Sequence, residues 1–235
     1  MNRIKRILYH IGEGFKNFFK SNEDRDEIKL NKLREYAENL MVKCGIDLEN
    51  VMVHNNGLFG QQGVDDKINV TCNGDRETIK ISKPHIPYII VPEVKDLWTF
   101  RAWIHEIGHY VCEHYLKHDS MFVYEMELEA EQFCVEFSKK CPYLSYSDLF
   151  FIRMSACDYL ETHVVKYAHS RKLTSAGVLV GSSIDNKVRE FLPKYRIDRL
   201  EKEIKKINYK KYLDWKNPTQ GRKPTEWELK NLNKK

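Results

Sequence analysis

The feature that most constrains this chain is a pair of histidines four residues apart, His105 and His109, with Glu106 directly after the first. On an α-helix, residues i and i+4 lie one above the other, so the two imidazoles can bind one metal ion. Glu106 points away from that face, and its carboxylate can therefore stand beside the ion and take a proton from water. The pattern predicts a catalytic zinc site with His105 and His109 as ligands and Glu106 as general base.

The residues around the motif predict the helix that carries it. Asp96 suits the N-cap position, and a helix is expected from there to about Lys117. Its apolar residues recur at helical spacing and are Leu97, Phe100, Ile104, Ile107 and Val111. His105 and His109 lie off this stripe, so a further element must cover them.

Catalytic zinc usually takes three protein ligands and keeps the fourth position for water. The next predicted helix follows a turn and N-cap at residues 118–120, and Glu127 lies on it, eighteen residues after His109. That separation allows an antiparallel return over the two histidines. Glu131, one turn later, can hydrogen-bond the outer nitrogen of a ligand histidine and fix its tautomer. The other candidates for the third ligand are Glu125, Glu129, Glu131, His114 and His118.

Residues 105–110, His-Glu-Ile-Gly-His-Tyr, are followed by residues 127–134, Glu-Leu-Glu-Ala-Glu-Gln-Phe-Cys. Together these segments resemble the ImmA/IrrE family of zinc metallopeptidases, which pairs HExxH with a later E-x-x-A-x-x-F helix; Cys134 replaces an alanine common in the family. The resemblance implies Zn²⁺ as cofactor and Glu127 as the third ligand. It also implies a protein substrate, because members cleave transcriptional repressors of phages and mobile elements.

The upstream segment predicts a helix at residues 28–44, ended by Gly45, and then several strands. The β-branched runs are residues 50–54, 67–72, 78–82 and 88–91. Asn73-Gly74 predicts a tight hairpin, and the glycine-rich residues 57–63 predict a turn or flap. The expected fold class is α+β: a small, mostly antiparallel sheet packed against helices in a gluzincin-like minimal zincin core, with helical appendages at both ends.

Composition divides the chain into five expected segments. Residues 1–20 form a basic amphipathic helix, 21–27 a linker, 28–170 the metallopeptidase domain, 171–211 a loop and helical segment, and 212–235 a mobile basic tail.

Partners and location follow from charge, hydropathy and cysteine usage. We expect residues 1–20 to bind either a partner protein or an anionic membrane surface, and we do not expect direct nucleic-acid binding. No stretch approaches the length of a membrane span. The six cysteines include no C-x-x-C pair, which favours reduced thiols and a cytoplasmic protein, in the bacterial host if a phage or mobile element encodes it.

A second hypothesis is a non-proteolytic adaptor or virion-associated binding protein that keeps zinc for structure. Glu106 argues against it, because a structural site has no use for a general base. For the peptidase, the candidate donors to the oxyanion are Tyr124, Tyr159, His163 and His169.

Overall fold

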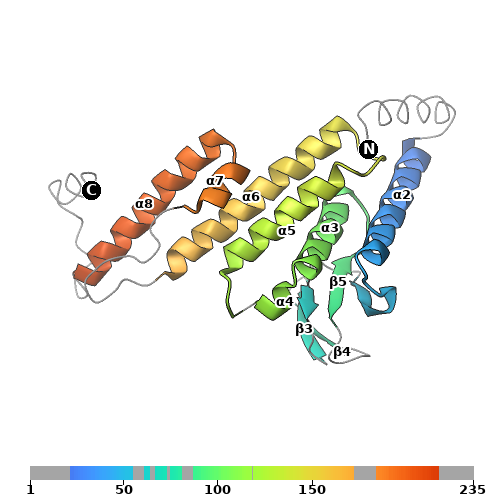
Figure 1. The fold of residues 1–235 in the computed structure, drawn as a ribbon, viewed down its shortest axis with the longest axis horizontal. Coiled ribbons are helices and arrows are strands. Elements are labelled where there is room, and N and C mark those ends of the chain that lie inside the picture. Colours follow the sequence, from blue (N-terminus) through green and yellow to red (C-terminus); the bar gives the residue numbers. More distant parts are fainter. Residues whose placement is uncertain are drawn as a thin grey trace. The chain divides into compact units, whose positions relative to one another are not determined.

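The computed structural model describes residues 22–54, 61–63, 67–72, 75–80, 87–117, 119–171 and 184–216 (Figure 1). This part of the chain is mostly helical, with small sheets. Its helices are α2 (Asn22–Lys43), α3 (Leu97–Val111), α4 (His114–Lys117), α5 (Val123–Ser138), α6 (Tyr146–Ser170), α7 (Asn186–Phe191) and α8 (Lys194–Lys216). The chain forms two compact units, Met1–Ala156 and Cys157–Lys235, so the division falls inside α6.

Helix α2 is longer than the sequence indicated. It begins at Asn22, so residues 22–27, which were expected to form a linker, are helical. Its end agrees with the prediction: Gly45 has a φ of 77°, a left-handed conformation that glycine adopts without steric cost. The predicted amphipathic helix at residues 1–20 lies outside the described residues.

Strand β5 (Tyr88–Pro92) is the central strand of a three-stranded sheet. β1 (Val51–His54) pairs with it in parallel and β2 (Gln61–Gly63) pairs with it antiparallel. All five residues of β5 are buried, which agrees with a strand covered on both faces. Strand β2 lies within the stretch that was expected to form a turn or flap.

Strands β3 (Lys67–Cys72) and β4 (Asp75–Lys80) form a separate antiparallel pair. Their register pairs Cys72 with Asp75, which confirms the hairpin expected at Asn73-Gly74. A mostly antiparallel arrangement was expected, and it holds for β2 with β5 and for β3 with β4. It does not hold for β1 with β5, because apolar alternation fixes which face of a strand is buried but not the direction of its neighbour.

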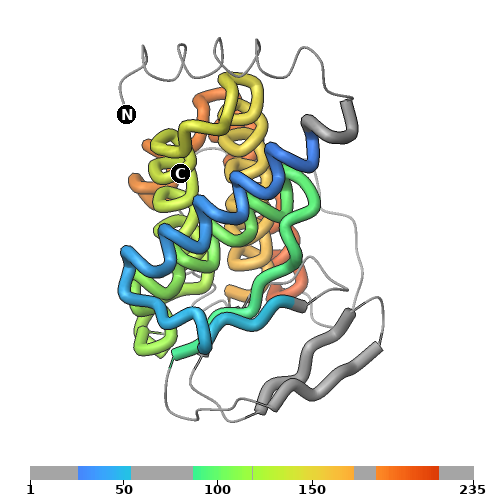
Figure 2. Tube along the Cα trace, turned by 90° about the vertical axis from the view of Figure 1, so that its right-hand side faces the viewer, coloured from blue at the N-terminus to red at the C-terminus, as the bar shows by residue number. Residues whose placement is uncertain are grey.

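Helix α3 lies at the centre of the first unit, packed against β5, α2 and α5 (Figures 1 and 2). Asp96 caps it as predicted: its carboxylate accepts a hydrogen bond from Thr99 N at 2.7 Å, and Thr99 Oγ1 accepts one from Asp96 N at 3.0 Å. Phe100, Ile104 and Ile107 are fully buried and join apolar residues of α2 and β5 in one core. This core fixes the direction in which the histidine face of α3 points.

The helix that carries the motif ends earlier than expected. It stops at Val111 instead of continuing to Lys117, and the short helix α4 begins at His114. Between them, Glu113 has a φ of 55°, a left-handed conformation that breaks the helix. The chain therefore changes direction directly after the second histidine.

Helix α5 also begins later than predicted. Ser120 is not its N-cap, because the helix starts at Val123. The Glu125 carboxylate instead accepts a hydrogen bond from the backbone N–H of Phe122 at 3.0 Å, which satisfies one donor at the helix start.

The second unit contains the C-terminal part of α6 together with α7 and α8. Its buried apolar residues include Leu160, Val164, Val188, Leu200 and Ile204. The buried guanidinium of Arg196 binds Glu161 at 3.0 Å and also binds Asp158. Helix α8 continues to Lys216, so residues 212–216, assigned to the mobile tail, are helical. Among the described helices, none combines the length and apolar character needed to cross a bilayer.

Candidate metal centre

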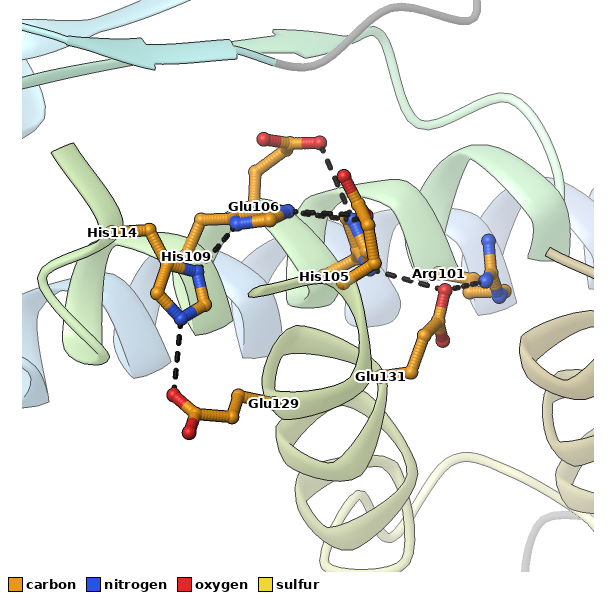
Figure 3. A network of polar contacts seen from close by, with 8 residues as sticks. Arg101, His105, Glu106, His109, His114, Glu129 and Glu131 are labelled. Carbon is orange, nitrogen blue, oxygen red and sulfur yellow. Dashed lines mark hydrogen bonds and ion pairs between the residues drawn. The ribbon is translucent and has the colours of Figure 1, made fainter. Parts of the chain in front are cut away.

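Two histidines of α3 and one glutamate of α5 bring their ligand atoms together beside the sheet. His105 Nε2 and His109 Nε2 lie 3.0 Å apart (Figure 3). Glu127 Oε2 lies 3.2 Å from the first nitrogen and 3.5 Å from the second. The three side chains are 5%, 13% and 12% exposed, so the group is shielded but reachable from solvent. These are the three residues that the sequence indicated as ligands.

The size of this triangle fits a tetrahedral metal site. With zinc–nitrogen and zinc–oxygen bonds of about 2.0–2.1 Å, neighbouring ligand atoms lie about 3.3 Å apart. Glu127 Oε2 is also buried, with the two imidazole nitrogens as its neighbours. Two imidazole nitrogens at 3.0 Å can share only one proton. A divalent cation at the centre would satisfy all three atoms at once, so the residues present fit such an ion.

The site has an excess of negative charge. Burial disfavours a charged imidazole, yet the nearby charge of Glu131 and the contact with Glu127 outweigh it and raise the pKa of His105 to about 10. Burial likewise opposes ionisation of Glu127, but contacts with His105 and His109 hold the pKa of that carboxyl well below its usual range. In the metal-free protein a proton on His105 therefore supplies the positive charge that a metal ion would otherwise bring.

Glu106 stands beside the ligand atoms without joining them. Its Oε1 lies 4.0 Å from His105 Nε2, and the residue is buried. Burial raises the pKa of Glu106, despite the opposing effect of the two histidines. A carboxyl group with a raised pKa in this position can accept a proton from water and later release it.

The outer nitrogen of His105 faces a buried ion pair. Its Nδ1 lies 3.1 Å from Glu131 Oε1, where the sequence placed that glutamate, and the same carboxylate binds the guanidinium of Arg101 (Figure 3). Arg101 and Glu131 are both buried. Sequence reasoning missed Arg101. Its signal is spacing: Arg101 lies one turn before His105 on the same face of a largely apolar helix.

The structure separates the four glutamates in the first half of α5, at positions 125, 127, 129 and 131. Glu125 binds the backbone at the helix start, and Glu129 Oε2 lies 3.1 Å from His114 Nε2. Glu131 lies on the outer side of the histidine pair, as described above. Of the four, Glu127 is the one that reaches both ligand histidines.

Of the other candidate residues, all but His118 lie in the described part of the chain. His114 is not part of the triangle; its Nδ1 lies 2.7 Å from His109 Nδ1, the nitrogen that faces away from the triangle. His118 is outside the described residues. The hydroxyl of Tyr124 lies 3.4 Å from Glu125 Oε1, at the start of α5. The three remaining oxyanion candidates belong to the second unit and are Tyr159, His163 and His169.

Close packing of α5 on α3 brings Glu127 into range. A Cβ at Gly108 would lie 3.0 Å from the Cα and carbonyl oxygen of Ala130 and 3.1 Å from the Cβ of Phe133. Most real side chains pack less tightly than this, so glycine at 108 allows the two helices to approach. The glycine at position 108 is therefore explained by helix packing.

Comparison with protein-family models, with characterised proteins and with solved structures finds no match for this chain. The likeness to ImmA/IrrE proteins therefore rests on the two motif segments. The fold and the residues define a candidate His-His-Glu metal centre between two packed helices.

Proposed function

We propose that the protein is a zinc-dependent metallo-endopeptidase of the ImmA/IrrE type. The observation that carries this proposal is the arrangement of His105, His109 and Glu127 around one point, with the carboxylate of Glu106 beside it. Three protein ligands and a neighbouring general base are the composition of catalytic zinc sites in hydrolases, which keep one position open for water.

Each residue has a defined task in this proposal. Zinc, when bound by His105, His109 and Glu127, supplies a Lewis acid that lowers the pKa of water and polarises a peptide carbonyl. Glu106 accepts the proton of the attacking water and passes it to the leaving amine, which its raised pKa favours. Glu131 holds the ring of His105 in a fixed orientation from the outer side.

The surrounding elements support a gluzincin-like zincin core. The motif helix α3 lies between the sheet and α5, which carries the glutamate ligand. In the three-stranded sheet, β2 is an edge strand and contacts α3. An extended peptide can add to such an edge through main-chain hydrogen bonds, with little demand on its sequence. We therefore propose a protein substrate, and the family resemblance suggests a transcriptional repressor.

The competing hypothesis of an adaptor with structural zinc fits the site less well. Structural zinc sites are closed by four protein ligands, whereas the described residues bring three to this point. An adaptor also has no need for a buried glutamate with a raised pKa beside the metal.

Proteolysis by wild type and by Glu106→Gln tests the proposal. Both proteins, loaded with zinc, are incubated with a host protein extract, and newly formed N-termini are identified by mass spectrometry. Wild type is expected to create new termini in a recurring sequence context, and Glu106→Gln to do so at least about 100-fold more slowly. The control Glu125→Gln, on the same helix, should cut like wild type. Zinc-loaded wild type that cuts no faster than Glu106→Gln overturns the proposal.

A further inference from the structure

Behind the ligand triangle, His109, His114 and Glu129 form a chain of polar contacts that the proposed function does not use. His109 Nδ1 lies 2.7 Å from His114 Nδ1, and His114 Nε2 lies 3.1 Å from Glu129 Oε2 (Figure 3). His114 is 2% exposed, so water does not compete for its ring nitrogens. Both nitrogens of this buried imidazole are therefore engaged by protein groups.

The break after α3 brings His114 into this series of polar contacts. In a continuous helix, residues five apart are turned about 140° from each other around the axis, so the two rings could not meet. The left-handed conformation of Glu113 ends the helix and returns His114 to the outer side of His109. Such a conformation is costly for a residue other than glycine and persists where the surrounding structure requires it.

The proton positions on the ring nitrogens of His109 and His114 follow from metal binding by His109, and this step rests on the proposed function. A neutral histidine that binds a metal through Nε2 carries its proton on Nδ1. His109 Nδ1 then donates to His114 Nδ1, which must accept. His114 consequently carries its proton on Nε2 and donates it to the carboxylate of Glu129. Every donor has an acceptor in this arrangement.

We propose that His114 and Glu129 are positioning residues that fix the tautomer and ring orientation of the metal ligand His109. They act on the outer nitrogen of His109 as Glu131 and Arg101 act on that of His105. Partners of this kind raise the basicity of a ligand histidine and typically account for about 10- to 100-fold in metal affinity.

An alternative use of the same residues is a second metal site. The side chains of Cys112, His114 and Glu129 also bring possible ligand atoms within 4.8 Å of one another. If His114 Nε2 bound a metal, its proton would move to Nδ1 and face the proton on His109 Nδ1. Two donors cannot lie 2.7 Å apart without an acceptor. The contact between the two rings therefore favours the hydrogen-bonded chain.

Zinc affinity, measured by competition with a chelator, separates these possibilities. His114→Ala should weaken zinc binding about 10- to 100-fold. His114→Asn, whose Oδ1 can still accept from His109 Nδ1, should recover part of that loss. Cys112→Ala should leave both affinity and stoichiometry unchanged. Loss of a second bound zinc in Cys112→Ala would instead establish the second metal site and overturn the proposal.

Proton positions in the zinc-loaded wild type give a test that needs no variant. Two-bond ¹H–¹⁵N correlation spectra of histidine-labelled protein report which ring nitrogen carries the proton. The expected result is a proton on Nδ1 of His109 and on Nε2 of His114. A proton on Nδ1 of His114 overturns the positioning role while leaving the metal site intact. A wild type that binds no zinc overturns the metal site itself and this inference with it.

Discussion

Arg101 matters because it neutralises a carboxylate that has no access to water. Glu131 is fully buried and its charge also faces His105. We predict that Arg101→Met lowers the free energy of unfolding by about 3 kcal/mol, because the variant leaves the charge of Glu131 without its partner. Urea denaturation of the metal-free protein measures this.

The double variant Arg101→Met/Glu131→Gln is the control, since it removes both charges together. It should recover much of the stability lost in Arg101→Met. A double variant that loses at least as much unfolding free energy as the two single variants together would show that Arg101 and Glu131 are not coupled as described.

Zinc affinity should depend on pH through His105. The charged groups that face this imidazole are Glu106, Glu127, Glu131 and, beyond Glu131, Arg101, with His109 as neighbouring ligand. Because its pKa is raised to about 10, the ion must displace a proton from His105 throughout the neutral range. Apparent affinity should rise roughly tenfold per pH unit from about pH 7 to pH 9, whereas an ordinary imidazole would give a flat dependence there.

The raised pKa of His105 also makes the stability of the metal-free protein depend on pH. A raised pKa in the folded state stabilises the fold fully below the ordinary value of about 6.5. That contribution is lost as the pH rises through about 10.

Competition with a chelator at three pH values measures the pH dependence of zinc affinity, and Glu131→Gln is the variant expected to flatten it. A wild-type affinity independent of pH would contradict the assigned charge state.

At the scale of helices, the approach of α5 to α3 depends on Gly108. We predict that Gly108→Ala lowers the free energy of unfolding by about 1–3 kcal/mol, because its methyl group meets the backbone of Ala130. It should also weaken zinc binding, since α5 carries Glu127 and must move outward. Urea denaturation and zinc titration measure both effects. Val111→Ala, at an exposed position of the same helix, should change neither.

The start of α6 provides a prediction about acid stability. Asp148 Oδ2 accepts a hydrogen bond from Ser145 N at 2.8 Å and pairs with Lys29 Nζ of α2 at 2.8 Å. Burial opposes ionisation, but Lys29 and Ser145 hold the pKa of Asp148 below its usual value. This carboxylate therefore stabilises the fold above the ordinary pKa of about 3.9, and the contribution is lost as the pH falls through the lower, folded value.

Asp148→Asn should accordingly cost about 1 kcal/mol of unfolding free energy at pH 7 and much less near pH 3. Unfolding in urea at the two pH values measures the difference, with the exposed Asp198→Asn as control. An equal cost at both pH values would show that the charge of Asp148 does not stabilise the helix start.

Helix interiors were more predictable than helix ends. The cap at Asp96 and the centre of the apolar stripe of α3 follow from local spacing, and both are observed, whereas Val111 at the end of the predicted stripe is exposed. The early end of α3 depends on Glu113, a residue type with no special preference for the left-handed conformation. Nothing in the local sequence therefore signals the break, and the contact between His109 and His114 was not predictable.

For the whole molecule, the sequence indicated the members of the site better than their surroundings. HExxH fixes two ligand atoms by helical periodicity alone, and a glutamate at a suitable distance completes the triangle. Arg101 was not predicted as part of the site because a lone arginine on a helix is usually exposed to solvent. The parallel pairing of β1 with β5 depends on the path of the connecting chain, which residue patterns do not encode.

The central claim is that His105, His109 and Glu127 bind one metal ion, and metal content tests it most directly. Wild type, Glu127→Ala, Glu106→Gln and Glu125→Ala are purified, reconstituted with zinc, freed of excess metal and analysed by mass spectrometry. We predict about one zinc per chain in wild type, Glu106→Gln and Glu125→Ala, and its loss in Glu127→Ala. Wild type without bound zinc, or Glu127→Ala that retains it as tightly as wild type, would contradict the account.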